Sequence, residues 1–168
     1  MSRPDAAVDS QRFREAMARF ASGVTVVTTI DEDAKVPVGF TASAFSSLSL
    51  DPPLVLVCLA RSADCYPAFA TAGSMAVSIL RVDQQDVALR FATRGADKFG
   101  PTALVHGEVT GLPLIRDALA HVECELWDRF DGGDHVILVG KVLLARVADG
   151  EPLLHFNRRF GRFLPLEE

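Results

Sequence analysis

The sequence is poor in cysteine, and this argues against two classes of small protein. Its 168 residues include three cysteines, Cys58, Cys65 and Cys124, an odd number with no C-x-x-C pair among them. Neither a disulfide framework nor a structural zinc site is expected, and the thiols are predicted to be reduced. Cys58 stands in the apolar run 54–59, so it is expected to be a buried core thiol.

The chain also lacks long apolar runs and long basic runs. No charge-free apolar stretch reaches the roughly 18 residues of a membrane span, and the N-terminus lacks the charged-then-apolar pattern of a signal peptide. The formal net charge is −5, and the densest basic patch, Arg158, Arg159 and Arg162, is interpreted as a solvated tail. We therefore expect a cytoplasmic protein that binds neither nucleic acid nor a membrane.

Signatures for nucleotides and metals are missing as well. There is no G-x-G-x-x-G after a strand, no Walker loop and no H-E-x-x-H helix. A nicotinamide cofactor is therefore expected to bind in an open groove as a visiting substrate, and no metal site is expected.

What the sequence does contain is enough apolar residues for one core, because 49% of its residues are hydrophobic. Strands are expected at 24–30, 36–43, 54–60 and 75–80, short strands at 103–109 and 112–114, and long strands at 118–130 and 135–147. The run 54–60 is apolar throughout, which predicts burial on both faces. The turn Asp131-Gly132-Gly133-Asp134 predicts an antiparallel hairpin between the two long strands. An antiparallel barrel is the expected closure, because it removes exposed edges.

At most three helices accompany these strands. The first is expected to begin at an Asp9 or Ser10 cap, to stop at Gly23 and to cover one mouth of the barrel. Its apolar residues recur at helical spacing, at Phe13, Ala16, Met17 and Phe20.

The second and third helices lie in the middle of the chain. The second is expected to end at Ala72, with Pro67 in its first turn. The third is expected to begin at a cap formed by Asp83 and to close at Gly95.

Five hydroxyls gather in the segment 39–54, which is otherwise small or apolar. If this segment is a strand, Thr41 and Ser43 point one way while Phe40, Ala42 and Ala44 point the other. Small residues let a planar ligand lie close to the backbone, and hydroxyls hydrogen-bond its rim or a phosphate tail, as a flavin requires. An ordinary strand and turn rich in Ser and Thr has the same composition, so this run alone leaves both interpretations open.

Several separated motifs break the tie, because together they resemble the flavin reductase family over about residues 12 to 164. They are Phe13–Met17, Phe20–Thr29, the hydroxyl segment with Asp51-Pro52-Pro53-Leu54-Val55, Asp83–Ala88 with Arg90-Phe91-Ala92, Asp97-Lys98-Phe99, Gly133-Asp134-His135 and Glu151–Phe156.

The resemblance implies a fold and an activity. The fold is a mainly β, antiparallel FMN-binding split β-barrel of Greek-key type with a few flanking α-helices, in a homodimer. The activity is hydride transfer from NADH or NADPH to FMN, or to FAD, which supplies reduced flavin to a partner monooxygenase. The resemblance also implies an N-terminal tail at residues 1–11 and a single flavin reductase-like domain at 12–168.

The resemblance implies roles for single residues too. His135 is the candidate catalytic residue and is expected to position the nicotinamide rather than to react. Lys98 is expected to meet a flavin or nucleotide phosphate, although a solvated loop lysine is the alternative. Arg61 and Ser62 are expected to end a strand and open a helix, whose free N–H groups would hold the flavin phosphate. The residues expected at the flavin and nicotinamide site are Thr41, Ala42, Ser43, Ala44, Phe45, Ser46, Ser47, Ser49, Cys58, Leu59, Arg61, Ser62, Phe91, Lys98, Phe99, His135 and Phe156.

The chain departs from the family pattern at a few positions. Asp64 follows Arg61 and Ser62 where the family often has Ser or Thr, so it is an anionic neighbour for a phosphate unless it turns away to cap the helix. Ser78 stands in place of a common asparagine, and Ala44 in place of a frequent serine. Because of these departures, the sequence does not decide whether the flavin is FMN or FAD. It also does not decide whether the reductant is NADH or NADPH.

Two other classes stay open. One is an FMN oxidase of the pyridoxamine-phosphate type, and the other is a non-catalytic split-barrel module that binds flavin or haem. Oxidation of NADH or NADPH in the presence of added flavin distinguishes a reductase from both.

Overall fold

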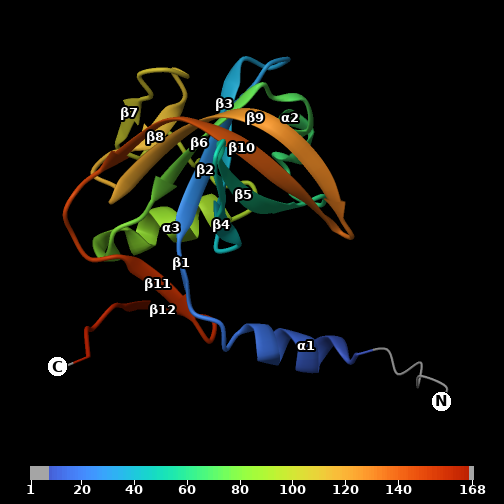
Figure 1. The fold of residues 1–168 in the computed structure, drawn as a ribbon, viewed down its shortest axis with the longest axis vertical. Coiled ribbons are helices and arrows are strands. Elements are labelled where there is room, and N and C mark those ends of the chain that lie inside the picture. The colour runs from blue at the N-terminus through green and yellow to red at the C-terminus, as the bar shows by residue number, and fades with distance from the viewer. Residues whose placement is uncertain (1–7, 167–168) are drawn as a thin grey trace.

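The computed structural model describes residues 8–166, and this part of the chain is mainly β with few helices (Figure 1). The expected tail at residues 1–11 lies outside the described residues over 1–7, and α1 already begins at Ser10. None of the helices in residues 8–166 is long and apolar enough to cross a membrane. In chain order the elements are α1 (Ser10–Met17), β1 (Ser22–Gly23), β2 (Thr25–Asp31), β3 (Val36–Ala42), β4 (Phe45–Leu50), β5 (Pro53–Ala60), α2 (Tyr66–Thr71), β6 (Ser74–Ile79), the 3-10 turn η1 (Val82–Gln84), α3 (Gln85–Ala92), β7 (Leu104–His106), β8 (Pro113–Ile115), β9 (Ala120–Gly132), β10 (His135–Val147), β11 (Leu153–Phe156) and β12 (Arg159–Arg162).

One antiparallel sheet of seven strands forms the body, in the order β3-β2-β6-β9-β10-β5-β4. Its edge strands β3 and β4 follow each other in the chain with only Ser43 and Ala44 between them, so the sheet must curl to bring its two edges together. The amide of Cys58 in β5 donates a hydrogen bond of 3.0 Å to the carbonyl of Ala44 at this seam. The predicted antiparallel barrel is therefore confirmed, with an opening between β3 and β5.

The hairpin of β9 and β10 is the longest pairing in the sheet. Its register runs from His135 opposite Gly132 to Val147 opposite Ala120. Gly133 takes a φ of 73° in the turn, a conformation that glycine adopts without the steric cost of a side chain. The predicted hairpin is confirmed, and it sets His135 directly opposite Ala60 of β5.

Burial on both faces occurs in β2 and not in β5, so that prediction was wrong. Every residue from Val24 to Thr29 is buried, and the threonine hydroxyls inside this stretch bond backbone carbonyls, as Thr25 does with Ala42 at 3.0 Å. In β5, Val55, Val57 and Leu59 are buried while the alternate residues are only partly covered. The second face of β5 is thus available to line cavities.

The core divides around β2. Val27 points into the barrel and Val26 points to the layer that α3 covers, since neighbouring residues of a strand face opposite sides. Large buried side chains fill both layers and provide the main apolar stabilisation. In the barrel they include Val57, Phe69, Met75 and Leu138, and under α3 they include Leu80, Phe91, Ile115 and Leu153.

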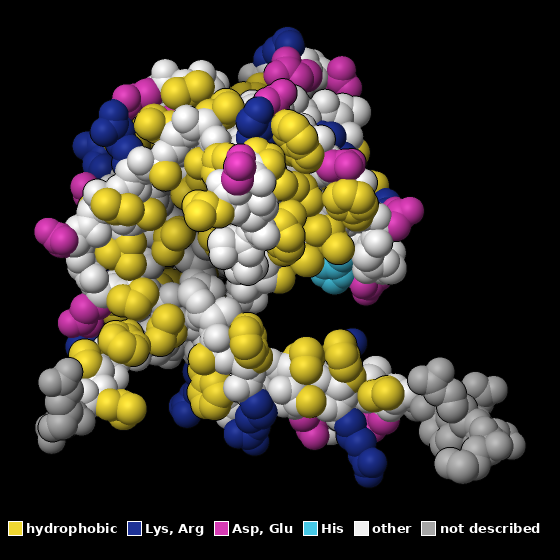
Figure 2. All heavy atoms as spheres, viewed as in Figure 1, with side chains coloured by type: hydrophobic (Ala, Val, Ile, Leu, Met, Phe, Trp, Pro, Cys, Tyr) yellow, Lys and Arg dark blue, Asp and Glu magenta, His cyan; other side chains and the backbone are white. Residues whose placement is uncertain are grey.

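The first helix does not cover a barrel mouth, contrary to the prediction. Asp9 caps it as expected, by accepting a hydrogen bond of 3.0 Å from the Gln11 amide, but it ends at Met17 and not at Gly23. It has no buried residue and projects from the body (Figure 1), and apolar side chains appear on its surface in Figure 2. Phe13 is 56% exposed and Phe20 is 78% exposed. An apolar helix face of this kind lacks a partner within the single chain.

The C-terminal segment was not predicted as regular structure. β11 pairs with β1 and with β12, which makes a separate antiparallel sheet of three strands beside α1. Arg159 and Arg162 bound β12 and are exposed, so the supposed tail is solvated but ordered as a strand.

Candidate functional site

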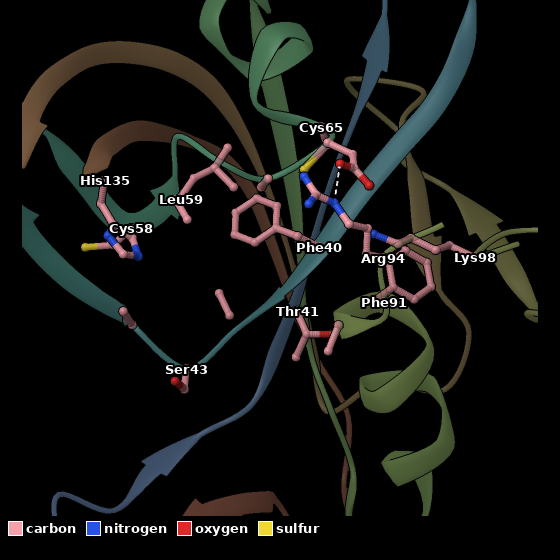
Figure 3. A pocket seen from close by; sticks show the side chains of 16 residues that line it. Phe40, Thr41, Ser43, Cys58, Leu59, Cys65, Phe91, Arg94, Lys98 and His135 are labelled. Atoms are coloured by element: carbon pink, nitrogen blue, oxygen red, sulfur yellow. Dashed lines mark hydrogen bonds and ion pairs between the residues drawn. The ribbon is translucent and has the colours of Figure 1, made fainter. Parts of the chain in front are cut away.

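A cavity of about 350 Å³ opens where the sheet's two edges meet, and we call it the seam cavity (Figure 3). β3, β5, the segment before α2, α3 and the start of β10 all contribute to it. Its lining consists of Phe40, Thr41, Ala42, Ser43, Ala44, Cys58, Leu59, Ala60, Ala63, Asp64, Cys65, Phe91, Ala92, Arg94, Lys98 and His135.

The walls of the seam cavity are apolar and fixed by packing. The rings of Phe91 and Phe99 meet edge to face, with centroids 5.1 Å apart, and Phe40 meets Phe69 in the same way at 5.2 Å. Such aromatic pairs hold each other in one orientation. Because many of the other lining residues are alanines, the cavity has room for a flat ring beside the backbone.

A histidine stands on one side of the seam cavity. The Nδ1 atom of His135 lies 2.7 Å from the Asp134 carboxylate, and its side chain is 44% exposed. The hydrogen bond from His135, followed by the charge of the ring, lowers the pKa of Asp134 below its ordinary value. An ionised carboxylate only accepts hydrogen bonds, so Nδ1 carries the proton and Nε2 is left for a ligand.

Two cations stand opposite His135 (Figure 3). The Arg94 guanidinium donates to the Asp64 carboxylate at 2.7 Å and to the Ser62 carbonyl at 2.8 Å. The Lys98 ammonium donates to the Gly39 carbonyl at 3.0 Å. One carboxylate therefore faces two positive charges at this side, which favours an anionic ligand.

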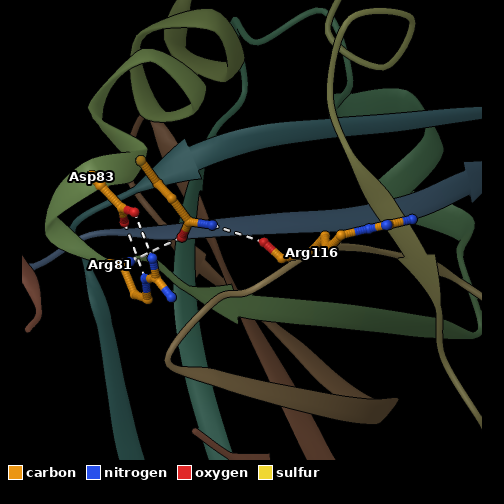
Figure 4. Close-up of polar contacts among 4 residues, drawn as sticks. Arg81, Asp83 and Arg116 are labelled. Carbon is orange, nitrogen blue, oxygen red and sulfur yellow. Dashed lines mark hydrogen bonds and ion pairs between the residues drawn. The ribbon is translucent and has the colours of Figure 1, made fainter. Parts of the chain in front are cut away.

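α3 places Phe91 and leads into Arg94, but it does not start as predicted. Asp83 was expected to cap it and instead pairs with the Arg81 guanidinium (Figure 4). The Gln84 amide oxygen accepts from the Arg81 amide at 2.9 Å, and its nitrogen donates to the Arg116 carbonyl at 2.8 Å. The η1 turn, in which the Gln84 side chain bonds the Arg81 backbone, therefore precedes the helix in place of an Asp83 cap. The helix α3 ends at Ala92, three residues before the predicted Gly95.

Burial disfavours the thiolate form of two of the three cysteines. Burial raises the pKa of Cys65, although the charge of Lys98 partly opposes this. Burial raises the pKa of Cys124 to about 12. Cys58 is partly exposed and lines the seam cavity, so the expectation of a buried core thiol was wrong.

The structure brings together about half of the residues expected at the site. Those in the seam cavity are Thr41, Ala42, Ser43, Ala44, Cys58, Leu59, Phe91, Lys98 and His135. Phe45 and Ser46 line the groove beside α1, and Phe99 lines a neighbouring cavity. Ser47, Ser49, Arg61, Ser62 and Phe156 are outside the seam cavity lining.

Arg61 and Ser62 do not form the expected helix-start anion site. Arg61 pairs with Asp131 and donates to the Tyr66 hydroxyl at 2.6 Å, so its guanidinium already has partners. α2 begins only at Tyr66 and has six residues, which separates Ser62 from the helix start. Asp64 pairs with Arg94 and does not cap that helix.

Sequence reasoning missed Arg94, the second cation of the cavity. The basic residue just after α3, four positions before Lys98, was the available signal, and it was not used. Phe40, Ala60 and Ala63 were missed because apolar and small residues carry no chemical signature of a site.

A larger groove, of about 930 Å³, runs between α1 and the barrel, and we call it the α1 groove. Phe13, Met17 and Phe20 line it from the helix side, and Phe45 and Leu56 from the barrel side. Ser43, Ala44 and Cys58 line both this groove and the seam cavity, so the two spaces adjoin.

The fold and the residues of the seam cavity agree with one protein family. Residues 17–164 match the model of the flavin reductase like domain, and the chain belongs to this family. Its barrel is thus the split barrel of the flavin reductases, as predicted.

Individual proteins support the same relationship. The chain is 46% identical over 156 residues to the actinorhodin polyketide dimerase of Streptomyces coelicolor, over 92% of this chain and 87% of the relative. It is 42% identical over 158 residues to the reductase component of the 4-nitrophenol 4-monooxygenase/4-nitrocatechol 2-monooxygenase of Rhodococcus opacus, over 94% and 83% of the two chains. The solved structure of the NADH:FAD oxidoreductase SgcE6 of Streptomyces globisporus, in complex with NAD and FAD fragments, matches with a TM-score of 0.88 at 39% identity, over 94% of each chain.

Proposed function

We propose that this chain is an NADH-dependent flavin reductase, which transfers a hydride from the nicotinamide to FMN or FAD. The observation that carries the proposal is the seam cavity of a flavin reductase like domain, in which a histidine and two cations surround one apolar space. The similarity to an NADH:FAD oxidoreductase and to a monooxygenase reductase component supports the same reaction.

The seam cavity fits a flavin in shape and in donors. Phe40 and Phe91 provide apolar walls for a flat ring, and its volume of about 350 Å³ lies within the usual range of ligand pockets. The Ser43 hydroxyl can bond heteroatoms on the ring's rim, and Lys98 and Arg94 offer charged N–H groups to a phosphate.

The bound flavin supplies the redox chemistry by accepting a hydride. The chain's contribution is to orient the two reactants, because fixed contact between them removes much of the entropic cost of the reaction. Asp134 holds the His135 ring through Nδ1, so Nε2 is set to accept a hydrogen bond from the N–H group of the nicotinamide amide. His135 therefore positions the nicotinamide and exchanges no proton with it.

We infer that the active form is a homodimer in which residues of both subunits frame the flavin. The apolar face of α1 is exposed in the single chain, and the α1 groove that it lines shares residues with the seam cavity. A second copy related by twofold symmetry would cover both apolar surfaces at once.

We also propose that residues 12–168 act as a single domain. A flavin-dependent monooxygenase would then consume the reduced flavin that this domain releases.

The test is NADH oxidation by the purified protein with and without added flavin. We expect turnover that depends on FMN or FAD. A protein that binds flavin and oxidises neither NADH nor NADPH would be a non-catalytic module, which would overturn the proposal.

A further inference from the structure

The hairpin of β9 and β10 ends in the turn 131–134, at the right of Figure 1, and His135 follows this turn directly. The ladder with β5 fixes the backbone of His135, opposite Ala60. The ring, in contrast, is oriented by the Asp134 carboxylate, which belongs to the turn. The turn contains two glycines, so it is flexible unless other contacts restrain it. The orientation of the histidine ring therefore depends on what holds the turn.

Arg61, the first residue after β5, holds the turn at both of its ends. Its backbone amide donates a hydrogen bond of 2.9 Å to the carbonyl of Asp134. Its guanidinium forms an ion pair with the carboxylate of Asp131. Because β5 lies inside the seven-stranded sheet, Arg61 ties the turn to the body of the barrel.

The guanidinium of Arg61 is itself held in place by Tyr66, the first residue of α2. It donates a hydrogen bond of 2.6 Å to the Tyr66 hydroxyl and lies over the Tyr66 ring, with its Cζ atom 5.5 Å from the ring centroid. The Asp131 side chain is 91% exposed, and an ion pair at such exposure is weak when both partners are mobile. A guanidinium whose orientation is already fixed loses less freedom when it forms the pair.

Arg61 and Tyr66 both stand outside the lining of the seam cavity. Neither residue is thus placed to contact a ligand bound there, and any effect of Arg61 on the reaction has to pass through another residue. The residue that the turn carries into the cavity is His135.

We propose that Arg61 is a positioning residue for the nicotinamide. Clamped by Tyr66, it holds the turn 131–134 through Asp131 and the Asp134 carbonyl, and Asp134 then orients the ring of His135. The inference rests on the proposed flavin reductase function, in which His135 meets the nicotinamide. It gives Arg61 a role on the nicotinamide side in place of the flavin phosphate contact that the family resemblance implies.

Steady-state kinetics and flavin titrations test this role. Arg61→Gln should raise the KM for NADH about threefold and leave the dissociation constants of FMN and riboflavin unchanged. Asp131→Asn should change the KM in the same direction by a smaller factor, and its 91% exposure keeps the fold out of the comparison. Arg61→Lys, which can still pair with Asp131, should recover part of the loss. Arg146→Gln is the matched control, because it breaks an exposed pair with Glu108 at the other end of β10.

A double variant separates action through the histidine from a general loss of structure. In a His135→Ala background, Arg61→Gln should raise the KM for NADH no further, because the ring that it positions is already absent. The amide order parameters of the turn glycines should fall from about 0.85 to below about 0.6 in Arg61→Gln and stay unchanged in Arg146→Gln. Factors on KM that multiply in the double variant, or a turn that stays rigid without Arg61, would overturn the proposal.

The flavin titrations distinguish the two roles of Arg61. An Arg61→Gln variant that binds FMN more weakly and riboflavin like the wild type would show that the guanidinium meets the flavin phosphate, and would overturn the proposal. A wild-type KM for NADH in both Arg61→Gln and Asp131→Asn would also overturn it. A wild-type protein that reduces no flavin would instead refute the function on which the inference rests.

Discussion

At the residue scale, the structure separates the hydroxyls that the protein itself occupies from those that a ligand can use. Thr41 donates to the Ala88 carbonyl at 2.6 Å and Ser46 donates to the Ser47 carbonyl at 3.0 Å. Ser43 is exposed and lines the seam cavity, whereas Ser47 lies further along β4. Thr41 and Ser46 therefore act as scaffold, and Ser43 is the hydroxyl that we expect to bind a ligand.

Single replacements of Ser43 and Ser47 should have different effects on flavin binding. Ser43→Ala should weaken it by about 0.5–1.5 kcal/mol, the net value of one hydrogen bond. Ser47→Ala is the matched control and should bind like the wild type, because Ser47 lies outside the seam cavity lining. Fluorescence titration measures both, and equal losses in the two variants would contradict this division.

His135 should affect the nicotinamide more than the flavin. His135→Ala should raise the KM for NADH about fivefold, as loss of a hydrogen bond worth about 1 kcal/mol predicts, and should slow hydride transfer through poorer alignment. Flavin affinity should change little. Stopped-flow reduction with His106→Ala as the control measures this, since His106 is exposed in β7. Lost flavin binding in His135→Ala would move His135 to the flavin's own pocket.

At the element scale, the sequence predicted well where a pattern has a single physical cause. The Asp-Gly-Gly-Asp turn and the two long strands were predicted correctly, because only glycine readily takes the positive φ that Gly133 has in this turn. The apolar run of β5 led to a wrong prediction of burial on both faces. Apolar residues that line a cavity or an interface look the same in the sequence as core residues. The burial of β2 on both faces was not predicted, since its buried threonines are satisfied by carbonyls that only the fold brings near.

The candidate site shows the same limit. His135 and Lys98 were found because a family motif marks them, and both line the seam cavity. Arg94 reaches the cavity through its pairing with Asp64, 30 residues earlier in the chain, and no local pattern encodes that contact. Arg61 was assigned to a phosphate because a nearby helix start was expected, and its partners Asp131 and Tyr66 are contacts that only the folded chain shows.

A buried carboxylate organises the loop between β7 and β8. Glu123 in β9 is 2% exposed and accepts hydrogen bonds from the amides of Glu108, Val109 and Thr110 and from the Thr110 hydroxyl. Burial alone would raise its pKa, but these hydrogen bonds outweigh burial, so the pKa lies below the ordinary 4.5.

Glu123→Gln should therefore destabilise the protein by about 1–3 kcal/mol, because an amide cannot accept all of these bonds and leaves buried donors unpaired. The stabilisation by Glu123 is fully present above pH 4.5 and is lost as the pH falls through the lowered folded pKa. The stability difference between wild type and variant should shrink over that acidic range. Urea unfolding at several pH values measures it, with the exposed neighbour Glu125→Gln as control. A difference that does not change with pH would show that the charge of Glu123 is not the cause.

At the scale of the whole molecule, the exposed apolar face of α1 lies beside the seam cavity. α1 projects from the barrel (Figure 1), and the groove beneath it adjoins the seam cavity through Ser43, Ala44 and Cys58. One chain alone leaves these surfaces uncovered, which explains why the helix was wrongly predicted to cap its own barrel. The helix is amphipathic as predicted, but its apolar face is expected to pack against a second copy of the chain.

Sedimentation should therefore report a dimer for the wild-type protein. Met17→Glu should shift it toward monomer, because Met17 is 55% exposed on α1 and lines the groove. Val36→Glu is the matched control, since Val36 is 46% exposed at the start of β3, outside that groove, and the variant should remain dimeric. A wild-type monomer that still reduces flavin would refute the shared site.

The central claim is that the seam cavity is where NADH reduces the flavin. Its most direct test is anaerobic stopped-flow reduction of FAD by NADH, followed by flavin absorbance, in the wild type and in two tryptophan variants. Ala63→Trp fills the seam cavity and should lose reduction almost completely, whereas Ala34→Trp, in the exposed turn between β2 and β3, should match the wild type. Circular dichroism establishes that both variants are folded. A folded Ala63→Trp variant that reduces FAD at the wild-type rate would contradict the account.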